Sequence, residues 1–180
     1  MWAPAFSRGG KSILHTLLRG LCCKSPDARA MQVAVMTDER IIEIDAASPL
    51  LADVFALRCE VFVAEQGVPR ELELDEHDGE ATHLAALRDG EVVGTLRLLR
   101  HAQTAKIGRV AVRAALRRAG IGRRLMERAA AIAAEQGFAE ILLHAQVSVA
   151  DFYRRLGYMA EGDVFDEAGI PHIAMRKRIS

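Results

Sequence analysis

The chain is poor in the residues that mark several large classes of protein. It has three cysteines, Cys22, Cys23 and Cys59, of which two are adjacent and none forms a C-x-x-C pair. Neither a disulfide framework nor a zinc site is therefore indicated. No apolar run approaches the roughly 18 residues that a membrane-spanning helix needs, so no membrane partner is expected. A reducing cytoplasm is the expected location.

Net charge and aromatic residues are scarce as well. Lysine plus arginine and aspartate plus glutamate both number 24, and only 5% of the residues are aromatic. A chain without excess positive charge gives no electrostatic case for nucleic acid, and its basic residues are not interleaved with stacking aromatics. No histidine or acid pair has the spacing of metal ligands on a helix. Nucleic acid and metal are therefore not expected as partners.

Charge is unevenly distributed along the chain. Residues 1–30 hold five basic residues against one acid, Asp27, and show weak periodicity. Such a basic segment is typical of a transit peptide or of an overlong start, and it lacks the apolar region of a secretory signal. We therefore expect a disordered or dispensable leader over residues 1–35 and a single domain over 36–180. With 51% hydrophobic residues, the chain can build a sizeable core.

In the first half of this domain, the sequence predicts a strand, then a helix, and then a two-stranded hairpin. A short apolar run predicts a strand over 40–45. Ser48 and Gly67 are suited to begin and end a helix. The acidic stretch 71–81 is expected to be a loop. Asp89 and Gly90 form a favoured two-residue turn between apolar runs, which predicts a hairpin.

The second half alternates strands and helices. Strands are predicted over 106–112 and 140–146, separated by a helix that ends near Gln136. A short helix over 148–158 and a final hairpin around residues 167–169 complete the pattern. Alternation of this kind indicates one mixed α/β domain.

A glycine-rich segment opens the longest predicted helix. Gly120 and Gly122 are flanked by arginines in "LRRAGIGRR". The free N–H groups of a helix start attract phosphates, glycines allow close approach, and arginines add charge. The segment lacks the Lys-Ser/Thr of a Walker loop and the third glycine of a dinucleotide fingerprint. It does fit the pattern R-x-x-G-x-G from Arg117 to Gly122.

Two separated motifs together resemble one family. The R-x-x-G-x-G element is followed, one helix and one strand later, by "ADFYRRLGY". This arrangement resembles the GCN5-related N-acetyltransferases (GNAT) over roughly residues 40–178. "RCEVFVAEQG", "LHAQVSVADFYRRLGY" and "DEAGIPHIAM" are similar to the ElaA branch. The resemblance implies the GNAT fold, a mixed central sheet of about six or seven strands with an antiparallel start and a parallel splayed pair, flanked by helices.

The same resemblance implies a cofactor and an acid. The cofactor is acetyl-CoA, with its pyrophosphate on the glycine element and its pantetheine arm on the preceding strand. Tyr153 matches the position that protonates the departing thiolate, and Ser148 stands where many relatives have asparagine. The cofactor-binding residues implied are Val110, Ala111, Val112, Arg117, Arg118, Ala119, Gly120, Ile121, Gly122, Arg123, Ser148, Phe152 and Tyr153.

The general base is less defined by the sequence. Glu65, at the end of the first helix, and His83, beside the acidic stretch, are the leading candidates. Asp75, Asp78 and His172 are alternatives, and a chain of water molecules could replace any of them.

The acceptor site is expected to combine residues implied by the ElaA resemblance with acids of the acidic stretch. Through the ElaA resemblance, its residues are Arg58, Arg97, Arg109 and Gln146, joined by Asp75, Asp78 and His172. Acidic side chains attract a cationic amine. Arg109 could instead pair structurally with an acid.

The predicted reaction is transfer of an acetyl group to the primary amine of a small molecule or peptide, by direct attack in a ternary complex. The resemblance allows a homodimer. Direct attack needs no covalent nucleophile, which leaves Cys59 a lesser alternative. Two other functions stay open. "LRCEVF" and "LDEHDGEATHL" are similar to acyl-homoserine-lactone synthases, and a catalytically silent acyl-CoA sensor or partner module would keep the glycine element.

Overall fold

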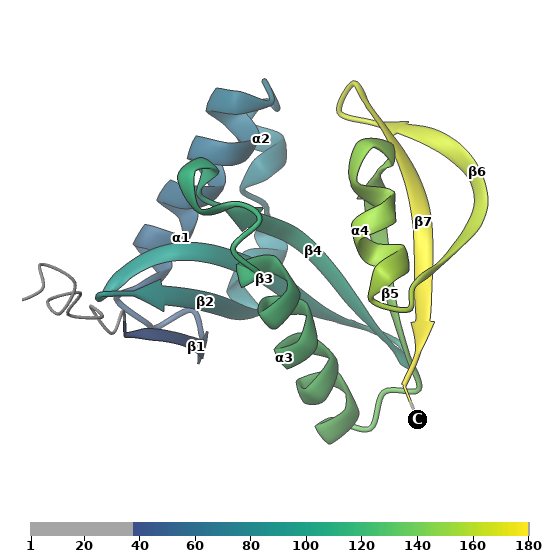
Figure 1. The fold of residues 1–180 in the computed structure, drawn as a ribbon, viewed down its shortest axis with the longest axis horizontal. Coiled ribbons are helices and arrows are strands. Elements are labelled where there is room, and N and C mark those ends of the chain that lie inside the picture. The colour runs from purple at the N-terminus through teal and green to yellow at the C-terminus, as the bar shows by residue number, and fades with distance from the viewer. Residues whose placement is uncertain (1–37, 180) are drawn as a thin grey trace, which may run out of the picture. The chain divides into compact units, whose positions relative to one another are not determined.

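The computed structural model describes residues 38–179, so the leader predicted over 1–35 lies outside the described residues. Its centre is a seven-stranded sheet in the order β1-β2-β3-β4-β5-β7-β6 (Figure 1). All neighbouring strands are antiparallel except β4 and β5, which are parallel. This arrangement agrees with the mixed sheet expected from the sequence. The strands are β1 (Glu39–Ile44), β2 (Thr82–Arg88), β3 (Glu91–His101), β4 (Thr104–Val112), β5 (Glu140–Gln146), β6 (Met159–Glu167) and β7 (Ile170–Arg178).

Helices pack on both faces of the sheet. Among residues 38–179, none has both the length and the apolar character needed to cross a membrane. The helical segments are α1 (Leu51–Arg58), the π-helical η1 (Cys59–Glu65), α2 (Arg70–Glu73), α3 (Ile121–Glu135) and α4 (Ala150–Arg155), with short 3-10 turns η2 (Glu76–Gly79), η3 (Ala114–Leu116) and η4 (Val147–Val149).

Both predicted hairpins form with tight two-residue turns. Asp89 and Gly90 have φ angles of 52° and 87°, and Ala168 and Gly169 have φ angles of 56° and 78°. Two consecutive positive φ angles match the twist of the flanking strands, which is why such turns favour glycine and aspartate. The turns fix the pairing of β2 with β3 and of β6 with β7.

The core has two layers, one on each face of β2 and β3. On one face, α1 contributes Val54 and Leu57. On the other face, α3 and α4 contribute residues such as Leu125 and Tyr153. A Cβ added to Gly94 of β3 would lie 2.8 Å from the Ile121 side chain, so this glycine lets α3 lie directly on the sheet.

Two sequence expectations need correction. The acidic stretch 71–81 is not a simple loop, because it overlaps α2 and contains η2. Asp75 and Asp78 cap η2 reciprocally: the side chain of Asp75 accepts from the His77 N–H, and Asp78 accepts from the Asp75 N–H. The helix expected from Ser48 begins instead at Leu51 and changes to a π-helix after Arg58.

Six charged side chains join α1, the acidic stretch and two strands. Arg58 donates to Glu73 at 2.6 Å and to Asp78 at 2.6 Å. Arg97 of β3 donates to Asp78 and Asp75 at 2.8 and 2.6 Å. We call Arg58, Glu73, Asp75, Asp78, Arg97 and Arg109 the buried ionic cluster. It contains equal numbers of cations and anions, so its members compensate each other's loss of water.

Arg58 is the centre of this cluster. It is fully buried, and its guanidinium also donates to the Glu73 carbonyl at 2.5 Å. These bonds join α1 to the acidic stretch at Glu73 and Asp78. Removing a single partner would leave the others buried without compensation.

We therefore predict that Arg58→Ala destabilises the domain strongly. Loss of one partner from a buried ion pair typically lowers the free energy of unfolding by about 3–5 kcal/mol. Arg154→Ala is the matched control, because Arg154 pairs with Asp151 at the surface, where such pairs contribute about 1 kcal/mol or less. Urea unfolding followed by circular dichroism measures both. A loss below about 1 kcal/mol for Arg58→Ala would show that the cluster does not hold the fold.

Candidate active site

The site begins where β4 and β5 separate. Their parallel pairing covers four positions, from Thr104 opposite Glu140 to Ile107 opposite Leu143. Beyond this point the strands diverge, as Figure 1 shows toward its upper edge. Backbone groups that a continuous sheet would pair are thereby left available along the opening, which we call the splay.

The splay is lined on the β4 side by two valines. The N–H of Arg113 donates to the Val93 carbonyl of β3. Because successive residues of a strand point their backbone groups to opposite sides, those of Val110 and Val112 point away from β3 and into the splay. The Ala111 side chain lies in the core layer under α1.

A bulge in β4 sets the position of these valines. The register with β3 shifts by one residue between the pairs Thr95–Ala111 and Arg97–Gly108. Arg109 occupies the bulge with a φ angle of 53°, a conformation that costs a residue with a side chain about 1–2 kcal/mol. Its guanidinium donates to the Leu72 carbonyl at 2.7 Å and lies 3.0 Å from the Glu73 carboxylate. The buried ionic cluster thus holds the bulge in place.

The glycine element follows β4 and leads into α3. Gly120 caps the helix with a φ angle of 83°. The first helical hydrogen bond runs from the Arg124 N–H to the Gly120 carbonyl, so the N–H groups of Ile121, Gly122 and Arg123 have no partner within the helix. A row of free donors with the positive end of the helix dipole suits an anionic group.

The arginines of this element differ in their contacts. Arg117 donates to the Val112 carbonyl at 3.0 Å and to Glu65 at 2.6 Å. Glu65, a predicted base, is therefore ion-paired at the edge of the splay. Arg118 and Ala119 form the exposed turn before the helix, and Arg123 donates to Glu127 at 3.4 Å.

Residues of α4 pack where the splay meets the glycine element. A Cβ on Gly122 would lie 3.5 Å from the Phe152 ring and 3.8 Å from the Val112 side chain, so this glycine joins α3, α4 and β4. Tyr153 is 7% exposed and packs edge-on against Phe152 and Tyr158. Burial raises the pKa of Tyr153 to about 12, so the phenol stays protonated at neutral pH. Ser148 is exposed in η4.

The predicted base His83 lies inside the protein. It is fully buried, and its Nε2 donates to the Asp78 carbonyl at 2.9 Å. Burial lowers the pKa of His83, which keeps the ring neutral. For Asp78, burial acts to raise the pKa, but the bonds to Arg58 and Arg97 outweigh it and lower the pKa to about 2. Desolvation prevails at Glu73, whose pKa is raised.

Five of the predicted acceptor residues lie together in the buried ionic cluster. Its more exposed members are Asp75 and Arg109, whose side chains are 26% and 21% exposed. The other predicted acceptor residues, Gln146 and His172, lie across the splay as opposite partners on β5 and β7. Gln146 donates to Gln66, which follows η1, at 2.8 Å. This bond spans from the α1 side of the sheet to β5.

Sequence reasoning missed three residues beside His172. His144 of β5 lies 4.9 Å from Phe165 of β6 between ring centroids, and its Nδ1 lies 2.9 Å from Glu167. The signal available was the spacing of His144 and Gln146, since two strand residues that differ by two share one face.

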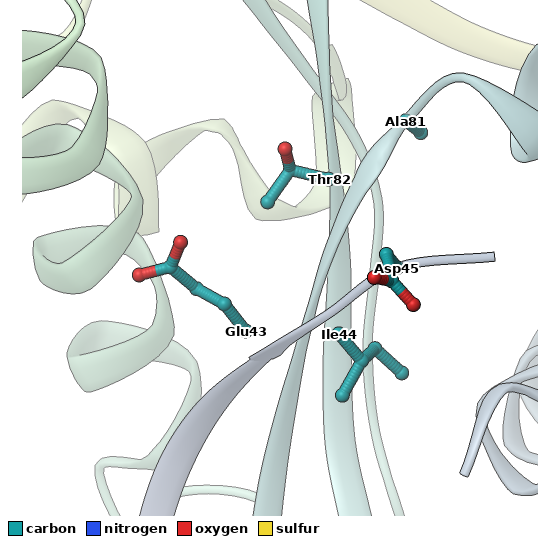
Figure 2. Close-up of a pocket in the computed structure, with 5 residues that line it drawn as sticks. All are labelled: Glu43, Ile44, Asp45, Ala81 and Thr82. Atoms are coloured by element: carbon teal, nitrogen blue, oxygen red, sulfur yellow. The ribbon is translucent and has the colours of Figure 1, made fainter. Parts of the chain in front are cut away.

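A shallow depression lies away from the splay, between β1 and β2. Figure 2 shows its lining, with Glu43 pointing toward α3, where it pairs with Arg128. None of the predicted site residues lines it; the residues are Glu43, Ile44, Asp45, Ala81 and Thr82.

Comparison with known proteins identifies the family of this chain. Residues 33–179 match the family model described as an acetyltransferase (GNAT) domain. The chain is 37% identical to YjcF of Bacillus subtilis, named as an uncharacterised N-acetyltransferase, over 71% of this chain and 91% of that protein.

Two solved structures are similar throughout their length. An acyl-CoA N-acyltransferase from Pseudomonas aeruginosa is 38% identical with a TM-score of 0.69, covering 78% of this chain and 99% of that one. ElaA of Escherichia coli is 30% identical with a TM-score of 0.69, covering 79% and 99%. The chain therefore belongs to the GNAT family of N-acetyltransferases, in the branch that contains ElaA.

Proposed function

We propose that this acetyltransferase uses acetyl-CoA to acetylate the primary amine of a small molecule or peptide by direct attack in a ternary complex, in the cytoplasm. The observation that carries the proposal is the continuity of the splay with the glycine element. One end offers free strand groups to an extended arm, and the other offers free helix N–H groups to phosphates.

The residues present fit this cofactor. The backbone groups of Val110 and Val112 suit the amides of a pantetheine arm, and the N–H groups of Ile121 to Arg123 suit a pyrophosphate. Arg118 lies in the turn before these donors and adds positive charge, and Arg117 and Arg123 of the same segment would do so on exchanging Glu65 and Glu127 for an anion. When bound, acetyl-CoA supplies an activated thioester.

Tyr153 is proposed as the acid. Its raised pKa keeps the phenol protonated at neutral pH, so it still carries a proton when the thiolate departs. A hydrogen bond from the phenol stabilises the developing negative charge and then delivers the proton to sulfur. The N–H of Val110, next to the bulge, is proposed to donate to the thioester oxygen, where charge also develops.

The buried ionic cluster is proposed to position the site. Arg58 has its donors taken by Glu73 and Asp78 and no exposed surface. Arg58 would therefore influence an acceptor only indirectly, by positioning Arg109 and the β4 bulge.

The first test is calorimetric titration with acetyl-CoA. We expect micromolar binding, about −8 kcal/mol, and no binding of S-adenosylmethionine or ATP under the same conditions. Binding of S-adenosylmethionine instead would favour the homoserine-lactone-synthase alternative. Absence of acetyl-CoA binding would refute the proposal.

The second test is Tyr153→Phe, which removes the proton and keeps the ring. We expect kcat to fall by about ten- to a thousandfold, since acid catalysis contributes on that order, while the Kd for acetyl-CoA stays within a factor of about two. Thiol release with a panel of amines measures kcat. Unchanged kcat would show that Tyr153 is not the acid.

The third test replaces each of two glycines with leucine, one at the start of α3 and one just after its end. Gly120 and Gly137 have φ angles of 83° and 77°, and a Cβ at either meets no backbone. Both substitutions should cost similar stability, about 1–2 kcal/mol. Only Gly120→Leu should abolish acetyl-CoA binding, because its side chain covers the free N–H groups. Equal affinities for the two variants would contradict the phosphate site.

A further inference from the structure

The second arm of the sheet, formed by β5, β7 and β6, has one covered and one open face. Ile141, Leu143 and Ala145 of β5 lie in the core layer with α3 and α4. Because strand residues alternate, His144 and Gln146 point to the opposite face. His172, the partner of Gln146, is on that face too, and both histidines remain partly exposed.

His144 is held by the β6–β7 hairpin. Its Nδ1 lies 2.9 Å from a Glu167 oxygen. An ionised carboxylate only accepts hydrogen bonds, so Nδ1 carries the proton. In the neutral ring, the lone pair is then on Nε2. Among residues 38–179, no hydrogen bond is made to this Nε2. Phe165 packs edge-on against the ring, which fixes its plane.

His144 lies where the splay begins. Leu143 is the last β5 residue paired with β4, so His144 is the first residue of β5 along the opening. On β4 the corresponding residues lead into the bulge at Arg109. A group between the strands at this level would have His144 on the open face, on the side of the sheet away from α4.

The other candidate bases are less suited. Glu65 is bound to Arg117, and His83 is fully buried with its Nε2 already donating. His172 donates from Nδ1 to the Ile170 carbonyl at 2.8 Å. Within residues 38–179, its Nε2 makes no hydrogen bond and no carboxylate contacts the ring.

We propose that His144 is the general base of the acetyl transfer and that Glu167 is its positioning residue. The inference rests on the proposed function. The acceptor arrives as an ammonium, loses one proton to Nε2 of His144, and attacks the thioester carbon with the freed electron pair. As the C–N bond forms and the C–S bond breaks, Tyr153 gives its proton to sulfur. The second amine proton then passes to the Tyr153 phenolate, and His144 releases the first amine proton to water.

Several charged groups surround His144. Glu167 of β6 contacts it directly, and His172 lies beyond Phe165 on β7. Arg176 of β7 is compensated by Glu140 and Glu161. Lys106 of β4 is the partner of Leu142 and so shares the face of His144.

The experiment measures kcat/KM against pH for His144→Gln, with His101→Gln as the control at an exposed histidine of β3. We expect His144→Gln to lower kcat/KM at neutral pH by about a hundredfold or more. It should also remove the rise of kcat/KM with pH that a histidine base causes. Acetyl-CoA affinity and the unfolding midpoint should match those of His101→Gln. Added imidazole should restore part of the activity of His144→Ala.

Glu167 is tested by Glu167→Gln beside Glu161→Gln on the same strand. A positioning role predicts a kcat about tenfold lower with KM unchanged for Glu167→Gln, and no change in kcat for Glu161→Gln.

The outcomes separate the two proposals. If the wild-type protein binds no acetyl-CoA, the proposed function fails. If it binds and transfers acetyl groups but His144→Gln keeps its rate and pH profile, the base assignment is overturned. If only His172→Gln removes the rise of kcat/KM with pH, His172 is the base and the assignment to His144 is overturned.

Discussion

The separation of β4 from β5 beyond Ile107 and Leu143 leaves strand groups unpaired in the middle of a sheet. Such groups are costly to bury without partners, so the opening is chemically a binding surface for an extended chain of amides. The glycine element lies at its end because β4 leads directly into it. A single interruption of pairing therefore aligns the two halves of the proposed cofactor site.

The opening needs a rigid edge, and the buried ionic cluster supplies it. Arg109 adopts an unfavourable φ angle that the bulge requires, and its bonds to α2 and Asp75 compensate for the strain. Arg58 and Arg97 fix the same acidic stretch from α1 and β3. The charges that suggested a surface for cationic acceptors thus neutralise one another, and attraction of an amine would depend on the acids outside the cluster.

Local patterns predicted most of the fold and the glycine element. The turns at Asp89 and Ala168, and the helix start at Gly120, depend on residues adjacent in sequence, where conformational preferences act directly. The buried ionic cluster joins Arg58 to Arg97 and Arg109 across distant elements, and His144 meets Glu167 only because β6 and β7 fold back beside β5. Pairings of this kind depend on strand order, which the spacing of residues does not contain.

The proposed acid and base lie on opposite faces of the second arm. Tyr153 of α4 belongs to the core layer that covers one face, whereas His144 points to the open face. Acetyl-CoA bound along the splay would have Tyr153 beside its sulfur and His144 on the other side of its thioester carbonyl. Because the sheet separates the two, the phenol stays dry and protonated while the imidazole can exchange its proton with water. This division is compatible with direct attack: His144 takes the first amine proton, Tyr153 gives a proton to sulfur and takes the second amine proton, and no side chain needs to carry the acetyl group.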